Sequence, residues 1–209
     1  RQIFIAAAFG VGITYDAFNY AYIIPGFLLI IIGGINGPLH NAVVAVLTPL
    51  SKKDGGIILT KVSIKLSILL LGLAVFIYFN SSLLIELLAP NLSYEAKSIA
   101  TYQLKILTPC IPLSGFIGLS FGALNSRRKF FLSSISPAIT SVTTIFFIVF
   151  SWILNHKNTS SNFLTYTGLL AFATLVGTFI QFVVLIWEIN KIGLFKLESN
   201  FKLFKDEEK

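Results

Sequence analysis

The sequence has little charge, a single cysteine and no methionine. Charged residues make up 12% of its 209 positions, whereas a soluble domain carries about 25%. One cysteine excludes an internal disulfide, so we expect Cys110 to be a small buried apolar residue. Because the sequence starts without methionine and inside an apolar run, we expect it to be part of a longer protein with its first helix truncated.

Catalytic and cofactor patterns are also missing. The sequence has no glycine-rich phosphate loop, no cluster of metal ligands, and no serine, histidine and aspartate set that would suit nucleophilic catalysis. His40 and His156 each stand alone, and we interpret both as structural or interfacial residues. We therefore expect no enzyme activity, no cofactor and no metal site.

Long uncharged runs are what the sequence has instead. Five of them are long enough to cross a hydrocarbon core about 30 Å thick, which takes about 20 helical residues. They cover residues 17–51, 66–85, 106–126, 130–155 and 158–187. This pattern predicts a polytopic membrane protein of the all-α class, a bundle of about six transmembrane helices.

The runs divide the chain into a transmembrane lobe, residues 1–189, and an amphipathic, charged tail, residues 190–209. The predicted helices cover residues 1–10, 17–51, 56–79, 95–124, 130–154 and 163–189, with a connection at residues 80–94. The second run is too long for one straight span, and its proline and glycine pairs predict a kink or a break.

Lysine and arginine collect in alternate loops. The segments between helices two and three, between helices four and five, and after helix six hold twelve of them: Lys52, Lys53, Lys61, Lys65, Arg127, Arg128, Lys129, Lys191, Lys196, Lys202, Lys205 and Lys209. The other loops carry only Lys97 and Lys157. Because cytoplasmic loops carry the excess of basic residues, we expect the tail in the cytoplasm. The placement also explains the net charge of +7 without a nucleic-acid partner.

Three charged residues are candidates for a site inside the membrane. Arg1 and Lys105 are each expected near the middle of the bilayer, where a cation is costly unless it meets water, a partner or an anionic ligand. Both are candidates for binding phosphate in a cavity between helices, and the alternative is a side chain that reaches the interface. Asp16 begins helix two, where it either caps the positive helix end or gates the cavity.

The stretch from Arg1 to Pro25 resembles the segment R-x₇-F-G-x-G-x₃-D-A-F-x₂-A-x₃-P of the MurJ (MviN) lipid II flippases. That family belongs to the multidrug/oligosaccharidyl-lipid/polysaccharide exporter superfamily. Further matches follow in the family's order at Ala89-Pro90, 104–109, 122–125, Phe130, Pro137, Gly177, Gln181 and 191–193. The resemblance therefore covers essentially the whole sequence.

The resemblance implies the first lobe of a two-lobe flippase of fourteen helices. Such a protein moves an undecaprenyl-diphosphate-linked peptidoglycan precursor from the inner to the outer leaflet of the bacterial inner membrane by alternating access. Its partners would be that precursor, membrane lipids and the C-terminal lobe. Arg1 matches a cavity arginine that would hold the diphosphate, and Asp16 matches an acidic residue near the outer gate.

The sequence departs from the family at two positions. Leu29 stands where a cavity arginine is expected, so either Lys105 substitutes for it or the substrate differs, and Ser133 replaces an early proline of helix five. Two alternatives therefore stay open among transporters: a flippase for another polyprenyl-linked glycan, and a drug or cation antiporter. A membrane scaffold that transports nothing is the alternative from another class.

Overall fold

A computed structural model describes residues 12–34, 37–155 and 163–194, and every regular element in these ranges is a helix. The helices are α2 (Ile13–Ile31), α3 (Pro38–Leu47), α4 (Lys52–Phe79), α5 (Ser81–Leu88), α6 (Tyr94–Leu107), α7 (Cys110–Ser126), α8 (Phe130–Asn155) and α9 (Phe163–Ile192). The predicted all-α class is confirmed. The predicted helix at residues 1–10 and most of the predicted tail lie outside the described residues.

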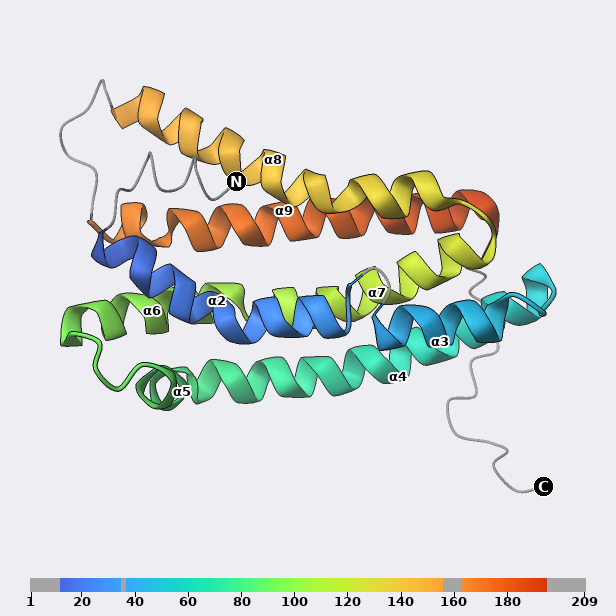
Figure 1. Cartoon of the computed structure of the whole chain (residues 1–209), viewed down its shortest axis with the longest axis horizontal. Helices are drawn as coiled ribbons and strands as arrows, with labels where there is room; N and C mark the ends of the chain where they lie inside the picture. Colours follow the sequence, from blue (N-terminus) through green and yellow to red (C-terminus); the bar gives the residue numbers. More distant parts are fainter. Residues whose placement is uncertain (1–11, 35–36, 156–162, 195–209) are drawn as a thin grey trace.

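The helices form an elongated bundle whose members run back and forth along one axis (Figure 1). α2 and α3 follow each other in one direction, α4 returns, α6 and α7 run forward again, and α8 and α9 complete the bundle. The most extensive packing joins α8 to α9, α2 to α6 and α3 to α7. α5 is the exception: it lies across the bundle axis, and Figure 1 shows it end-on beside the end of α4.

Several of these helices can cross a membrane. Among the described residues, α4, α8 and α9 are long and apolar enough, and α6 with α7 makes a fourth candidate if this pair, bent by 45°, is one span. α2 is not among them, because Asp16 and Asn19 lower the hydropathy of its 19 residues. The chain is thus a multi-pass membrane protein, and the expected count of six spans stays a prediction.

Both broken regions of the bundle contain proline. The expected break in residues 17–51 falls between α2 and α3, and Pro38 takes the first position of α3, where its missing N–H is harmless. The single helix expected over residues 95–124 is wrong. It is divided at Thr108 and Pro109 into α6 and α7, because proline cannot donate the hydrogen bond that would continue α6.

Two other boundaries differ from the prediction. α4 begins at Lys52 rather than near residue 56, because Ser51 caps it by accepting a hydrogen bond from the Asp54 backbone N–H at 3.1 Å. Lys53, Asp54, Gly55 and Gly56 therefore belong to the first turns of this helix. Residues 80–94 were expected as a connection, but they contain the eight-residue helix α5.

α7 is the centre of the bundle and packs against α2, α3, α4, α8 and α9. Twelve of its 17 residues are buried, including Cys110, as predicted. Its small residues let neighbouring backbones approach: a methyl group on Gly118 would overlap the carbonyl oxygen of Ile32, and one on Gly122 would lie 2.5 Å from Val43. Small residues at helix contacts are typical of membrane bundles, where close packing drives association.

We predict that Gly118→Ala destabilises the bundle by about 1–3 kcal/mol, because the added methyl group overpacks the contact with Ile32. The matched control is Gly72→Ala, since a methyl group there meets nothing within 4 Å. The apparent melting temperature of the complete gene product in detergent measures both. Equal melting temperatures for the two variants would contradict the close approach of α2 to α7.

Candidate functional site

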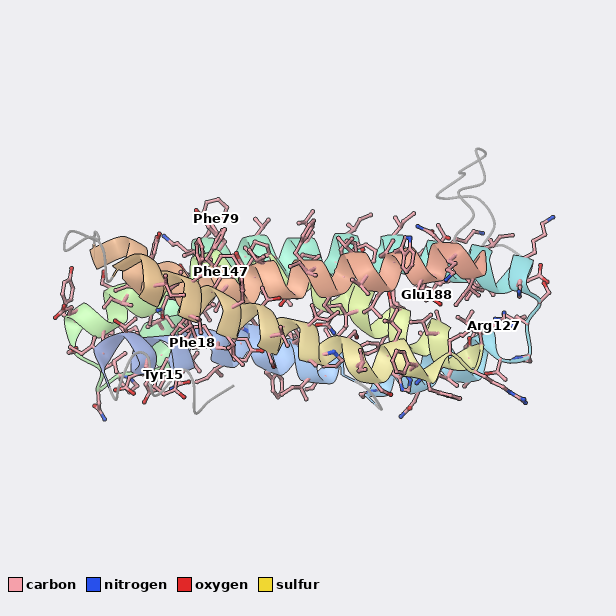
Figure 2. The ribbon with its side chains drawn as sticks, turned by 90° about the horizontal axis from the view of Figure 1, so that it is seen from above. Tyr15, Phe18, Phe79, Arg127, Phe147 and Glu188 are labelled. Atoms are coloured by element: carbon pink, nitrogen blue, oxygen red, sulfur yellow. The ribbon has the colours of Figure 1, made fainter. Side chains whose placement is uncertain are left out.

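The exposed face of α2 changes character along its length. Asp16 and Asn19 are exposed in its first turns, and Ile23, Phe27 and Ile30 continue the same face at helical spacing. The opposite face is buried and includes Ala17, Phe18 and Ala21, and α2 packs most extensively against α6. Figure 2 shows Tyr15 and Phe18 of this helix near one end of the bundle. Apart from Ile13, which is 47% exposed, this face is polar in its first turns and apolar toward the middle of the bundle, which suits an amphiphilic ligand.

Asp16 lies in the first turn of α2, and Gly12 is the N-cap residue. The N-cap glycine has extended backbone angles and no side chain with which to accept a hydrogen bond. The exposed carboxylate of Asp16 therefore complements the positive end of the helix without being its cap. Its proposed part in a gate stays a prediction.

Lys105 is exposed in the last turn of α6, and its Nζ lies 5.6 Å from the ring centroid of Tyr78. Tyr78 is the penultimate residue of the 28-residue helix α4. Lys105 is therefore level with the end of the membrane-length helix α4, and its expected position near the middle of the bilayer stays a prediction. α6 begins beyond the end of α4 (Figure 1), so only its last turn lies beside α4.

Of the three predicted site residues, the structure describes Asp16 and Lys105, which are exposed on different helices. Arg1 lies outside the described residues. The exposed stripe of α6 contains Ser98, Tyr102 and Lys105, and Lys105 points to α4, while Asp16 is on the exposed face of α2. Leu29, at the position of the expected arginine, is half-buried on α2.

The basic segments expected on one side of the membrane do meet at one end of the bundle. The guanidinium of Arg127 donates two hydrogen bonds to the Leu50 carbonyl oxygen, both 3.1 Å, and one to that of Ser51 at 3.2 Å. These contacts join the end of α7 to the link between α3 and α4. Gly56 of α4 lies against the Leu194 carbonyl after α9, so Lys191, the basic residue of the third segment that the structure describes, is near the same end. Figure 2 shows Arg127 and Glu188 there.

Buried polar side chains tie the helices together, and the sequence analysis did not find these contacts. Asn125 donates to His40 Nε2 at 2.8 Å and accepts from the Ser133 hydroxyl at 2.7 Å, which joins α7 to α3 and α8. The structural interpretation of His40 is confirmed, and Ser133 uses the hydroxyl that the family's proline would lack. At the other end, Gln103 of α6 donates to the Thr167 carbonyl of α9 at 2.6 Å. Partners so far apart in sequence leave no local signal.

Apolar helices of membrane length, two broken helices and a basic end define the chain as a multi-pass membrane protein. The family model described as "Lipid II flippase MurJ" matches residues 5–207. The chain belongs to the MurJ family of lipid II flippases.

Individual relatives agree with this assignment. A "probable lipid II flippase MurJ" of Synechocystis is 40% identical over 203 residues, which is 96% of this chain and 38% of the relative. The lipid II flippase MurJ of Thermosipho africanus is 30% identical over 145 residues, 69% of this chain and 30% of the relative. A solved structure of lipid II flippase MurJ in an inward closed conformation superposes with a TM-score of 0.72 at 27% identity, covering 93% of this chain and 39% of that one. The chain thus spans less than two fifths of the length of these relatives.

We predict that Arg127→Lys lowers the stability of the complete gene product by about 1–2 kcal/mol, because an ammonium cannot reproduce the three guanidinium bonds to Leu50 and Ser51. Arg128→Lys is the matched control, since Arg128 is the next residue and is exposed. Thermal melting in detergent compares them. A loss of stability that is the same for both variants would refute the specific role of Arg127.

Proposed function

We propose that this chain forms the first lobe of a transporter that moves a lipid-linked peptidoglycan precursor from the inner to the outer leaflet. Membership of the MurJ family over nearly the whole chain is the observation that carries this proposal. The precursor joins a polar headgroup to a long hydrocarbon chain through a diphosphate. Transport by alternating access needs a path that accepts both parts and forms no covalent bond.

The exposed face of α2 supports the proposal. Its polar first turns, with Asp16 and Asn19, suit the headgroup, and its apolar continuation at Ile23 and Phe27 suits the hydrocarbon chain. In a two-lobe transporter this face would form part of the wall between the lobes. Asp16 would then lie at the outer opening of the path, where its carboxylate repels anionic groups that have already passed.

A cation must hold the diphosphate while it crosses the apolar region. We assign this role to Arg1, since a guanidinium can donate two parallel hydrogen bonds to phosphate oxygens. The alternative cation, Lys105, lies beside Tyr78 near the end of α4 and on a different helix face from Asp16. We therefore infer that Lys105 serves the membrane interface.

We predict that Arg1→Ala in the complete gene product abolishes growth of cells depleted of their own lipid II flippase, because the diphosphate loses its charged partner. Arg1→Lys keeps the charge and should restore part of the growth. The control is Lys97→Ala, since the Lys97 ammonium already donates to the Pro90 carbonyl oxygen at 2.9 Å. Normal growth with Arg1→Ala at a normal membrane level would overturn the assignment.

The proposal includes the orientation of the lobe in the membrane, with the Arg127 end in the cytoplasm and Asp16 on the outer side. A membrane-impermeant maleimide tests it in cells with an intact plasma membrane. We predict labelling of Asp16→Cys in intact cells and of Lys129→Cys only after lysis, with low background because Cys110 is buried. Labelling of Lys129→Cys in intact cells, and of Asp16→Cys only after lysis, would show that the proposed orientation is wrong.

A flippase for another undecaprenyl-diphosphate-linked glycan is the second candidate, because Leu29 stands where the family is expected to have a cavity arginine. Both candidates share the diphosphate, so Arg1 is required in each. They differ in the depletion experiment: the wild-type gene product restores growth only if it accepts the peptidoglycan precursor.

A further inference from the structure

The short helix α5 lies across the bundle axis at the end opposite Arg127. Figure 1 shows it end-on, while the other helices run along the picture. Asn80 is the only residue between α4 and α5, so the chain turns sharply where α4 ends. A helix that lies across the end of a transmembrane bundle is parallel to the membrane plane.

The surface of α5 has three sectors. Ser81 and Ile85 are buried against the bundle. Ser82 and Glu86, one turn apart, form an exposed polar sector. Leu83 and Leu87, also one turn apart, form an exposed apolar sector with 62% and 75% of their surface accessible. A helix that only linked α4 to α6 in water would gain nothing from exposing two leucines on one side.

The level of α5 follows from its neighbour α4. The exposed apolar face of α4 begins after Lys61 and Lys65 and ends with Phe76 and Phe79, the latter 79% accessible. From Lys65 to Phe79 the helix rises about 21 Å, and because a lysine side chain can reach back to the interface, such a band fits a hydrocarbon core about 30 Å thick. Because α5 starts two residues after Phe79, it lies where the apolar band of α4 stops.

Neighbouring residues also have the character of a membrane boundary. Tyr78 and Tyr102 are exposed at this level, and tyrosine is enriched where hydrocarbon gives way to headgroups. The Lys105 ammonium beside Tyr78 has the same preference for the interface. The apolar sector of α5 is therefore continuous with a surface that lipid covers.

We propose that α5 is an interfacial helix, with Leu83 and Leu87 inserted at the boundary between headgroups and acyl chains and with Ser82 and Glu86 facing water. Its partner is the lipid surface of the leaflet at the end opposite Arg127. The helix fixes the depth of this end of the lobe in the bilayer. This proposal depends on membrane insertion and not on the identity of the transported lipid.

Spin labels test the proposal in the complete gene product, reconstituted in phospholipid vesicles. Four variants each carry one label, Ser82→Cys, Leu83→Cys, Glu86→Cys and Leu87→Cys, in a background where Cys110 and every cysteine of the rest of the gene product are replaced by alanine. All four sites are exposed, so the labels leave the buried core intact. Collisions with oxygen, which concentrates in hydrocarbon, are compared with collisions with a water-soluble nickel chelate. Leu69→Cys on the apolar face of α4 and Lys53→Cys near its start serve as references for lipid and water.

We expect the labels at Leu83 and Leu87 to collide severalfold more with oxygen than with nickel, and the labels at Ser82 and Glu86 to show the opposite preference. Equal access to nickel at all four sites would place α5 in water and overturn the proposal. Labels at Leu83 and Leu87 that are shielded from both reagents would show that protein covers the leucines, and this result would also overturn it. Failure of the flippase assignment would leave these collision ratios unchanged.

Discussion

The structure depends on how its two broken helices satisfy their backbones inside a membrane. Lipid offers no hydrogen bonds, so irregular backbone at membrane depth is tolerated only where protein covers it or where it lines a water-filled cavity. Here the break after α2 is seated on α7, with Gly33 against the Ser114 carbonyl and Gly118 against the Ile32 carbonyl. At the second break the Ile111 N–H donates to the Thr108 carbonyl at 3.0 Å. The small residues of α7 make this close contact possible.

The two breaks divide the paired helices into two halves. α2 packs with α6 in one half and α3 packs with α7 in the other. α8 and α9 continue through both halves, whereas α4 ends beside the last turn of α6. Each half has its own polar tie: Gln103 joins α6 to α9, and Asn125 joins α7 to α3 and α8. The polar part of the exposed α2 face and the interfacial helix α5 both belong to the half opposite Arg127. The polar surfaces that would meet lipid headgroups are therefore at one end of the bundle, and Arg127 with its basic neighbours is at the other.

The sequence predicted the features that depend on composition over long segments. The absence of charge from five runs indicated the membrane class. The alternation of basic loops predicted that the segments after α3 and after α7 lie on one side of the membrane, and the Arg127 contacts show both at one end of the bundle. It also predicted the break between α2 and α3, where glycine and proline cluster. The resemblance predicted the family because several short matches occur in the family's order, although none of them is specific by itself.

Features set by tertiary contacts were missed. The eight residues of α5 are too few for a periodic signal, and only its place at the end of α4 explains its exposed leucines. The contact of Lys105 with Tyr78 depends on where α6 lies relative to α4, and no pattern within a single helix predicts it. The tie between His40 and Asn125 spans 85 positions and appears only when α3 and α7 pack together. Arg1 remains a prediction from the resemblance.

Translocation of a fluorescent lipid II by the purified complete gene product in vesicles tests the central claim most directly. The account predicts that labelled lipid placed in one leaflet appears in the other far faster than in protein-free vesicles, and that Arg1→Ala returns the rate to the protein-free level. Folded, correctly inserted wild-type protein that leaves the lipid in its original leaflet would contradict the account.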